Sequence, residues 1–523
     1  EMIEERILPR TISSQHPDNV YGPPWLGGPV IAGDAEVEEV FYSWARLGCI
    51  ECMWDAEGKD VDLNVVRKLY TSHDDFFREH LIGRDYFLTY RIPNPTLEIS
   101  DRKIYFETLQ SIPKHADAAS LFYGKDVNPP VFEVILPFTK TTGELVRLVN
   151  TYQRAVASLG DIPIDYPDLR LGEVIGDVKP KNIEVIPLFE DFDSIRTLDS
   201  IISRFVELQS PRYMRVFIAR SDPALNNGLV PATLLSMLSL QKISNVVSET
   251  GIPVHPIIGV GTMPFRGGLA PDHLETFLKQ YGGFTTVTIQ SAFRYDYPEN
   301  LVRESIARLN NTLPKTRLPD PKTLEETILS DVVMKLAEAY LGIVSEAAPS
   351  ITALSRLVPA RRTRKLHVGA FSYSRRVGGL ELPRAIPFAC VFYSLGMPPE
   401  FIGLRAIRLM NDTEQSLIME SYTTLKDDLN RVAPLVSFEN INMLLERGEE
   451  STLLKPLQSS LPLYMEDIQT AEEIFGVKTG PRRLTERKYS NMVNNFLISL
   501  LEGDMASAAS ELLSAAKIRH CLG

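Results

Sequence analysis

Six short apolar stretches recur along this chain, and most are followed by residues with helical spacing. They are DYFLTYRIPNP (85–95), PPVFEVILPFTKTTGELVRLV (129–149), NIEVIPLFEDFDSI (182–195), RYMRVFIARSDPALNNG (212–228), IPVHPIIGVGTMPFRGG (252–268) and FTTVTIQSAFRYDYP (284–298). Apolar strands that alternate with helices indicate a parallel sheet covered on both faces. The pattern leaves two architectures, an open doubly wound sheet or a (β/α)8 barrel.

Polar residues at the C-terminal ends of these strands favour the barrel. They are Arg91, Thr139, Lys140, Glu190, Asp222, Arg266, Gln290 and Arg294. In a barrel all the strand ends converge on one face, so residues from many strands can build one site. An open sheet usually concentrates its site at one crevice behind a G-x-G-x-x-G turn, and no such motif follows a strand here. We therefore predict an α/β fold with a (β/α)8 TIM-type barrel.

From about Thr323 onward the sequence is mostly helical, as in TLEETILSDVVMKLAEAYLGIVSEA and NNFLISLLEGDMASAASELLSAAK. We find no linker of Pro, Gly and Ser, no low-complexity segment and no short repeat. We expect a single catalytic domain over 1–523, with barrel strands mainly within about 45–400 and additional, mainly C-terminal, helices over about 320–523.

The overall charge and the apolar pattern exclude several classes of protein. A net charge of −12 argues against a nucleic-acid surface, although a local basic pocket for an anionic metabolite stays possible. No apolar run approaches the roughly 18 residues of a membrane span. The first residues, EMIEERILPR, are too charged for a secretory signal. With only 4 cysteines, we expect a cytoplasmic protein without nucleic-acid or membrane partners.

Cys49 and Cys52 form a C-x-x-C pattern in LGCIECMWD. The pair could be redox-active or half of a zinc site, but no second pair follows at zinc spacing. Because the segment is apolar and strand-like, we interpret both as buried thiols without a chemical role.

Glu190 and Asp222 each follow directly on an apolar strand. Two carboxylates at the rim of a barrel, without a cysteine or histidine cluster, are typical of a site for Mg²⁺ or Mn²⁺. The alternative is that each carboxylate caps the helix that follows it.

Several arginines lie in or beside the expected strand-end loops: Arg91, Arg266, Arg294, Arg375, Arg376 and Arg384. Arg266 precedes Gly267 and Gly268, and glycines let a backbone approach an oxyanion while a guanidinium binds it in a fork. The alternative, a glycine turn with a solvated side chain, explains any one of these arginines better than it explains the whole set. Together with a cation, the set indicates a small substrate that carries phosphate and carboxylate groups.

His16 lies in RTISSQHPDNV (10–20), ahead of any obvious strand or helix. Pro17 restricts the backbone of His16 to an extended geometry, so the imidazole is presented from a stiff segment. By itself the segment is typical of a turn, because Pro-Asp-Asn is common in loops.

Taken together, these stretches resemble phosphoenolpyruvate carboxylase, and closely the short archaeal-type form. The motifs follow in order along almost the whole chain: SSQHPDN, MWDAEGKDVD, YRIPNPTLE, EVILPFTKTTGELV, VIPLFEDFDSI, FIARSDPALNNGLV, GVGTMPFRGGLAP, IQSAFRYDYP and RRVGGLELPRAIPF. Each motif alone is weak, but their order and spacing are specific. The resemblance implies the barrel of the phosphoenolpyruvate/pyruvate superfamily.

The long bacterial and plant forms of the family carry similar segments. Their catalytic histidine lies in Thr-Ala-His-Pro-Thr-Glu, which is similar to the segment around His16. Their metal ligands stand where Glu190 and Asp222 stand, and their mobile loop ends in Arg-Gly-Gly like 266–268. Their Gly-Gly-x-Glu-Ser-Leu-Arg-Ala-Ile-Pro stretch is similar to residues 378–387, which include Arg384.

The sequence departs from the long forms at two places. Their glycine-rich loop begins with a histidine and an arginine, where this chain has Ile258 and Val260. Their Gln-Asn-Thr-Gly tail, which helps to hold an inhibitory dicarboxylate, is replaced by IRHCLG. We therefore do not carry over their allosteric site.

The resemblance implies that phosphoenolpyruvate and bicarbonate become oxaloacetate and phosphate with Mg²⁺ or Mn²⁺ in a homotetramer. His16, Arg266 and Arg91 are then the catalytic residues. Substrate binding falls to Arg294, Gln290, Gly267, Gly268, Arg384, Arg376, Thr139 and Lys140. Two alternatives are another metal-dependent lyase or mutase of the superfamily, and a barrel that binds an anionic metabolite without turnover.

Overall fold

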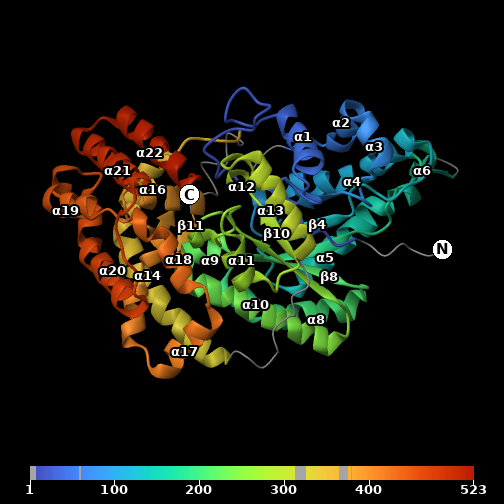
Figure 1. Cartoon of the computed structure of the whole chain (residues 1–523). Coiled ribbons are helices and arrows are strands. Elements are labelled where there is room, and N and C mark those ends of the chain that lie inside the picture. Colours follow the sequence, from blue (N-terminus) through green and yellow to red (C-terminus); the bar gives the residue numbers. More distant parts are fainter. Residues whose placement is uncertain (1–6, 58–60, 166–167, 313–324, 364–374, 378–379) are drawn as a thin grey trace.

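Eight parallel strands form a closed barrel in the order β1-β10-β9-β8-β7-β4-β3-β2 (Figure 1). The computed structural model describes residues 7–57, 61–165, 168–312, 325–363, 375–377 and 380–523, and of 375–377 only the backbone. The strands are β1 (Thr11–Ser13), β2 (Glu51–Asp55), β3 (Phe87–Arg91), β4 (Glu133–Leu136), β7 (Glu184–Phe189), β8 (Met214–Ala219), β9 (Val254–Gly259) and β10 (Thr286–Ile289). The six apolar stretches supply six of these strands, which confirms the barrel.

The first strand of the barrel comes from the segment that looked like a turn. β1 pairs in parallel with β10 through Ile12 and Thr288 and with β2 through Ile12 and Glu51. It lies ahead of the range about 45–400 in which we expected most strands, and the turn interpretation is wrong for its first residues. Three residues are too few to show a periodic pattern, and only pairing on both sides makes them a strand.

The interior of the barrel is divided into an apolar layer and a charged layer. The apolar layer is built by one residue or two from most strands: Ile12, Met53, Ile135, Ile186, Leu188, Phe217 and Ile257. At the N-terminal ends of the strands, Arg215 of β8 binds Glu51 at 2.7 Å and Glu133 at 3.0 Å. Because these charges are paired and buried, they close the barrel at the end opposite to the strand-end loops.

Helices surround the barrel, as Figure 1 shows. They are α1 (Asp34–Phe41), α2 (Val65–Ser72), α3 (Asp74–Glu79), α4 (Arg102–Tyr123), α5 (Thr142–Tyr152), α6 (Leu171–Ile175), α7 (Phe192–Arg196), α8 (Leu198–Gln209), α9 (Ser221–Asn227), α10 (Leu229–Thr250), α11 (Leu274–Tyr281), α12 (Ser291–Tyr295) and α13 (Glu299–Thr312). A short antiparallel pair, β5 (Pro163–Asp165) and β6 (Leu169–Arg170), precedes α6.

The C-terminal third is helical, as expected, and forms the part of Figure 1 beside the barrel that runs from yellow (α14) through orange to red. Its elements are α14 (Glu326–Leu354), α16 (Ala385–Ser394), α17 (Asp412–Ser421), α18 (Leu425–Val432), α19 (Phe438–Arg447), α20 (Leu461–Phe475), α21 (Leu484–Glu502) and α22 (Met505–Arg519), with the hairpin β11 (Arg375–Val377) and β12 (Leu380–Leu382). α14 packs against α9 and α10 of the barrel. This packing places C-terminal residues beside the strand-end loops.

Cys49 and Cys52 are both buried and neither forms a disulfide bond, which agrees with their interpretation as buried thiols. Burial raises the pKa of Cys49 to about 12. A thiol with such a pKa is a poor nucleophile.

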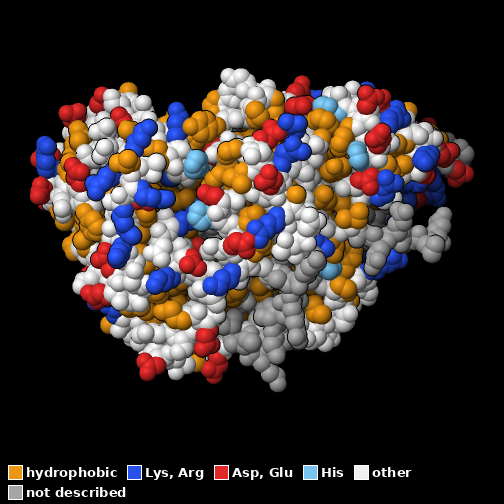
Figure 2. Space-filling view, in the orientation of Figure 1, with side chains coloured by type: hydrophobic (Ala, Val, Ile, Leu, Met, Phe, Trp, Pro, Cys, Tyr) orange, Lys and Arg blue, Asp and Glu red, His pale blue; other side chains and the backbone are white. Residues whose placement is uncertain are grey.

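Within the described ranges, no individual helix has both the length and the apolar character of a membrane span. The neighbouring segments Ala385–Ser394 and Pro399–Leu409 meet those criteria only as a pair, and they bend by 101°. Figure 2 shows basic, acidic and apolar side chains interspersed on one face of the molecule.

Candidate active site

The predicted residues lie at the C-terminal ends of the strands or in the loops that follow them. Arg91 ends β3, Glu190 follows β7, and Asp222 lies in the first turn of α9, directly after β8. His16 follows β1, and Arg266 lies in the loop after β9. The prediction that these ends form one face of a barrel is therefore confirmed by the strand order.

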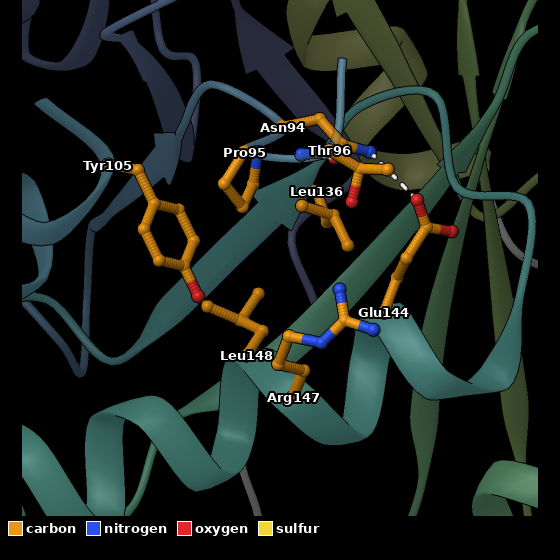
Figure 3. A pocket seen from close by; sticks show the side chains of 8 residues that line it. All are labelled: Asn94, Pro95, Thr96, Tyr105, Leu136, Glu144, Arg147 and Leu148. Carbon is orange, nitrogen blue, oxygen red and sulfur yellow. Dashed lines mark hydrogen bonds between the residues drawn. The ribbon is translucent and has the colours of Figure 1, made fainter. Parts of the chain in front are cut away.

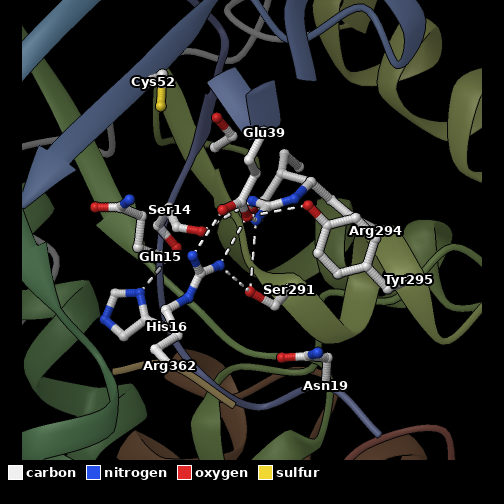
Figure 4. A network of polar contacts seen from close by, with 12 residues as sticks. Ser14, Gln15, His16, Asn19, Glu39, Cys52, Ser291, Arg294, Tyr295 and Arg362 are labelled. Carbon is white, nitrogen blue, oxygen red and sulfur yellow. Dashed lines mark hydrogen bonds and ion pairs between the residues drawn. The ribbon is translucent and has the colours of Figure 1, made fainter. Parts of the chain in front are cut away.

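The ring of His16 is held by a residue of its own segment. Nδ1 of His16 lies 2.8 Å from Oγ of Ser14, as Figure 4 shows. Ser14 is itself fixed, because its carbonyl oxygen accepts a hydrogen bond from Nη1 of Arg294 at 2.9 Å. The orientation of the imidazole thus follows from the end of β1 rather than from a free side-chain rotation.

Burial and four arginines keep His16 neutral. Its pKa lies well below 6.5, first because of burial and then because of Arg91, Arg266, Arg384 and Arg362. A proton on the ring would add a positive charge beside four others. A neutral imidazole can accept a proton, which a general base requires.

Arg266 is buried and makes hydrogen bonds to protein groups with all three of its nitrogens. Nε donates to Ser221 at 3.1 Å, Nη2 to Gln290 at 2.5 Å, and Nη1 to Asp18 at 3.1 Å and to the carbonyl oxygen of Gly523 at 2.8 Å. The family resemblance implied that this arginine belongs to a mobile loop. The structure shows this arginine in a fixed position where three strand-end segments meet.

The glycines after Arg266 are required by backbone geometry. Gly267 has φ of 114° and Gly268 has φ of 80°, which side chains other than glycine rarely adopt. A Cβ on Gly267 would also lie 2.4 Å from Cγ1 of Val260. Val260, which stands near the place of the missing loop arginine, is therefore a buried packing partner of the glycine turn.

Arg91 is oriented by two carboxylates, one from the last residue of β2 and one from the segment that follows it. Its Nε donates to Asp55 at 3.1 Å, and its Nη2 lies 2.7 Å from Glu57. These carboxylates, together with Glu190, raise the pKa of Arg91 above its ordinary value despite its burial. Arg91 is thus a fixed, permanent cation beside Glu190.

Glu190 is positioned by an unusual backbone conformation. Its Oε2 accepts a hydrogen bond from the backbone N–H of Phe138 at 2.7 Å. Phe138 has φ of 51°, an uncommon value for a residue other than glycine. The strained loop after β4 therefore fixes one carboxylate oxygen of the predicted metal ligand.

A small pocket lies behind this loop, between α4 and α5 (Figure 3). Asn94 at its edge donates to the carbonyl oxygen of Pro137 at 2.9 Å and to Glu144 at 3.3 Å. The amide thus ties the segment after β3 to the segment after β4 that holds Glu190.

Arg294 lies in a buried cluster rather than at an open mouth. Glu39 of α1 accepts hydrogen bonds from Arg294 at 2.5 Å, from Tyr295 at 3.0 Å and from both terminal nitrogens of Arg362 at 2.6 and 2.7 Å (Figure 4). These partners outweigh burial and lower the pKa of Glu39 to about 2. The side chain of Arg294 is 1% exposed. The hydrogen bonds of Arg294 in the described residues thus go to protein groups, and its contact with a substrate stays a prediction.

Three other predicted substrate contacts are also directed to protein groups. Oγ1 of Thr139 donates to the carbonyl oxygen of Leu136 at 2.8 Å. Lys140 is 56% exposed and lies 3.3 Å from Asp191. Gln290 uses its amide oxygen to accept from Arg266. Lys140 is thus on the outer rim, because its side chain extends toward the helix that follows β7.

The segment around residues 375–387 is described only in part. Arg375 and Arg376 lie in β11, and their side chains are outside the described part. Arg384 stands at the N-terminus of α16 and contributes to the low pKa of His16. Of the arginines predicted in this segment, the structure therefore brings Arg384 to the histidine.

Sequence reasoning missed several residues of the site: Ser14, Asp18, Glu39, Asp55, Glu57 and Arg362. Asp18 is the most informative of them, because one carboxylate oxygen binds Arg266 and the other accepts from the N–H of Ala292 at 2.8 Å. Ser14, Asp18, Asp55 and Glu57 lie inside motifs that already pointed to function. The partners of Glu39 lie far from it in sequence and left no local signal.

A (β/α)8 barrel with carboxylates, arginines and a histidine at the C-terminal ends of its strands is typical of a TIM-barrel enzyme. A family model described as phosphoenolpyruvate carboxylase matches residues 8–523. The chain belongs to the phosphoenolpyruvate carboxylase family.

Curated relatives with this name cover nearly the whole chain. The phosphoenolpyruvate carboxylase of Metallosphaera sedula is 40% identical over 99% of this chain and 100% of its own length. That of Caldivirga maquilingensis is 40% identical over 99% and 100%. That of Pyrococcus abyssi is 42% identical over 90% and 96%.

Proposed function

We propose that the chain catalyses the carboxylation of phosphoenolpyruvate by bicarbonate, which gives oxaloacetate and inorganic phosphate and feeds C4 acids to central metabolism. The observation that carries this proposal is the position of His16, which follows β1, is held by Ser14 at 2.8 Å and lies among Arg91, Arg266, Arg384 and Arg362. A proton acceptor inside a cluster of cations suits a reaction in which an anionic substrate must lose a proton. The names of the relatives support the same activity.

The donor set at the ends of β7 and β8 fits a divalent cation. Glu190 and Asp222 offer carboxylate oxygens at the ends of two neighbouring strands. The described residues contain no group of three or more His, Cys, Asp or Glu that could hold a metal ion, so water and substrate oxygens would complete the coordination. Two carboxylates suit Mg²⁺ or Mn²⁺, which usually keep waters and bind substrate oxygens. When bound, the cation supplies positive charge for the enol oxygen and the phosphate.

The arginines neutralise the phosphate and carboxylate of the substrate. Arg91 and Arg384 are best placed to bind these anionic groups, because both lie near His16 and neither is as fully buried as Arg266. Arg266, with Gln290, Gly267 and Gly268, shapes the wall on the side of β9 and β10. Fixed cations stabilise developing charge without reorganisation during the reaction.

His16 acts in the second half of the reaction. An oxygen of bicarbonate attacks phosphorus, the bond from phosphorus to the enol oxygen breaks, and carboxyphosphate and the enolate of pyruvate form. The imidazole then takes the carboxyl proton of carboxyphosphate, which separates into CO₂ and phosphate. The enolate carbon attacks CO₂ to form oxaloacetate. Exclusion of water by the anchored Arg266 loop keeps the enolate from being protonated to pyruvate.

A coupled assay tests this proposal. Phosphate release and oxaloacetate formation are measured together, with and without bicarbonate. We expect both products only with bicarbonate. Turnover without bicarbonate would favour another lyase or mutase of the superfamily, and metal-dependent binding without turnover would favour a barrel that only binds a metabolite.

We also propose that residues 1–523 work as one catalytic domain, because the helical third reaches the barrel mouth. The N–H of Leu522 donates to the carbonyl oxygen of Asp18 at 2.8 Å, and Gly523 accepts from Arg266. From the family resemblance we further propose a cytoplasmic homotetramer, which light scattering tests through its mass.

A further inference from the structure

The backbone of Phe265, the residue before Arg266, is held by two buried charged side chains. Its N–H donates to Oε1 of Glu400 at 3.1 Å, and its carbonyl oxygen accepts from Nη1 of Arg220 at 3.0 Å. The ring of Phe265 also stacks on Phe388 of α16 at 5.8 Å. The turn Pro264–Arg266 is therefore held by Arg220 of the barrel on one side and by Glu400 and Phe388 of the helical third on the other.

Glu400 lies in the turn Pro399–Phe401, far from the strand ends in sequence, and is fully buried. Its Oε1 also accepts a hydrogen bond from the hydroxyl of Tyr393 at 2.5 Å. Its Oε2 is buried, and among the described residues it has no hydrogen-bond partner. Burying a carboxylate oxygen that has no hydrogen-bond partner costs free energy. A neutral amide would accept the same hydrogen bond from the N–H of Phe265 without burying a charge.

The ionisable groups around Glu400 come from three helices. Tyr393 of α16 and Arg431 of α18 lower its pKa, and Tyr464 of α20 also faces it. Burial acts in the opposite direction and is the largest effect, so the pKa of Glu400 is raised to about 7. The carboxyl therefore changes its charge in the neutral range, while Arg431 uses its own Nη1 to bind the carbonyl oxygen of Gly268 at 3.2 Å.

We propose that Glu400 is a positioning residue for Arg266, and that its charged form holds the N–H of Phe265 and thereby seats the loop at the barrel mouth. This inference rests on the proposed role of Arg266 in carboxylation. A hydrogen bond to a charged acceptor is roughly twice as strong as one to a neutral acceptor. Protonation of Glu400 thus weakens the hydrogen bond that holds the N–H of Phe265, and the loop that carries Arg266 is held less firmly as the pH falls.

Asp467 of α20 offers a matched control. It is also fully buried, and its pKa is also raised to about 7 by burial. It accepts from the N–H groups of Gly403 at 2.9 Å and Arg405 at 2.7 Å, outside the loop of Arg266. A pH effect that belongs to Glu400 should therefore persist unchanged when Asp467 is changed.

The test is hydrogen exchange of the backbone amides of residues 261–269 in the full chain between pH 6 and 8.5, corrected for intrinsic exchange rates. In the parent, we expect protection of Phe265 to rise about fivefold to tenfold as the pH rises through about 7. In Glu400→Gln, protection should stay at the low-pH level throughout. In Asp467→Asn, it should follow the parent.

Steady-state kinetics over the same range connect the loop to the reaction. The parent should gain kcat/KM with the same midpoint as the protection, and Glu400→Gln should lack this step. Tyr393→Phe provides a second variant, because loss of the hydroxyl removes an effect that lowers the pKa of Glu400. Both transitions should then move to higher pH, which a merely structural role would not produce.

Equal pH dependence in the parent and Glu400→Gln would overturn the proposal. So would the loss of the transition in Asp467→Asn, or a loop transition without any change in kcat/KM. If Glu400→Gln does not fold, two other results can still overturn the proposal. One is a parent in which the protection of Phe265 does not change with pH, and the other is Tyr393→Phe with its pH transition at the same midpoint as in the parent. Hydrogen exchange does not depend on turnover, so it tests the role of Glu400 even in an inactive protein. A parent that makes no oxaloacetate would contradict the proposed function and leave the exchange result to be judged by itself.

Discussion

Nη1 of Arg266 and Oδ2 of Asp18 form a 3.1 Å ion pair in which neither side chain is more than 1% exposed. Asp18 lies two residues after His16, so this pair ties the loop after β9 to the segment that carries the imidazole. The second oxygen of Asp18 binds the N–H of Ala292 in α12. The ends of β1, β9 and β10 thus meet on one carboxylate.

Arg266→Lys should be a severe change although the charge is kept. Lysine has one nitrogen where the guanidinium binds Ser221, Gln290, Asp18 and Gly523 from three. We expect turnover to fall on the order of 10²-fold, because a charged donor is lost from a closed site. Steady-state kinetics measure this, with Arg204→Lys, an exposed arginine of α8, as the control. Parent kinetics in Arg266→Lys would contradict any role of this side chain.

Ser14→Ala should disturb the reaction through the orientation of His16. The variant removes the only side-chain group that holds Nδ1 at 2.8 Å among the described residues. Loss of one hydrogen bond corresponds to roughly a tenfold effect, and we expect it as less oxaloacetate per phosphate released. Ser13→Ala is the control, since the Ser13 hydroxyl donates to the backbone of Glu51 instead. An unchanged product ratio in Ser14→Ala would show that the ring needs no such support.

Asp222→Asn should abolish most activity without unfolding the protein. A carboxylate at the rim that holds a cation contributes to transition-state charge rather than to the core. The measurements are turnover against Mg²⁺ or Mn²⁺ concentration and the thermal midpoint, with exposed Asp193→Asn as the control. Full turnover of the parent in excess chelator would contradict the metal assignment.

Asp467→Asn should change how stability depends on pH. The folded pKa of Asp467 is about 7, which is above its ordinary value of 3.8, so the folded state holds a proton that the unfolded state has released. Stability from this group is present below about pH 4 and is lost as the pH rises toward 7. The loss is on the order of 4 kcal/mol. Urea unfolding at pH 5.5 and 8 should show a smaller loss in the variant than in the parent or Asp193→Asn, and an equal loss would contradict this pKa.

The sequence predicted the barrel because the decisive signal is local. Six apolar stretches predicted β3, β4, β7, β8, β9 and β10, and the polar residues that follow these stretches lie at the strand ends. β1 escaped because Thr11–Ser13 is short and is defined only by its partners on β2 and β10. A strand of this length has no pattern of its own.

The sequence predicted where the candidate site residues lie along the barrel, but it did not predict which protein groups they bind. Arg266 and Arg294 are at the expected strand ends, yet their donors bind Asp18, Gly523 and Glu39. These partners are separated from them by more than two hundred residues in sequence, so no local spacing could reveal the pairs. A strand-end arginine can bind a substrate or brace a neighbouring loop, and only the fold distinguishes the two.

The most direct test of the proposed chemistry is the product ratio of His16→Asn, measured as oxaloacetate, pyruvate and phosphate in one reaction. Attack of bicarbonate on phosphorus depends on the cation and the arginines, so phosphate release should survive in part. Asparagine cannot accept the carboxyl proton, and a positioned base is typically worth about 10²–10⁴-fold. We expect bicarbonate-dependent phosphate release with pyruvate in place of oxaloacetate. Oxaloacetate at the parent rate, or an equal loss of phosphate release and carboxylation, would contradict the role of His16 as the base.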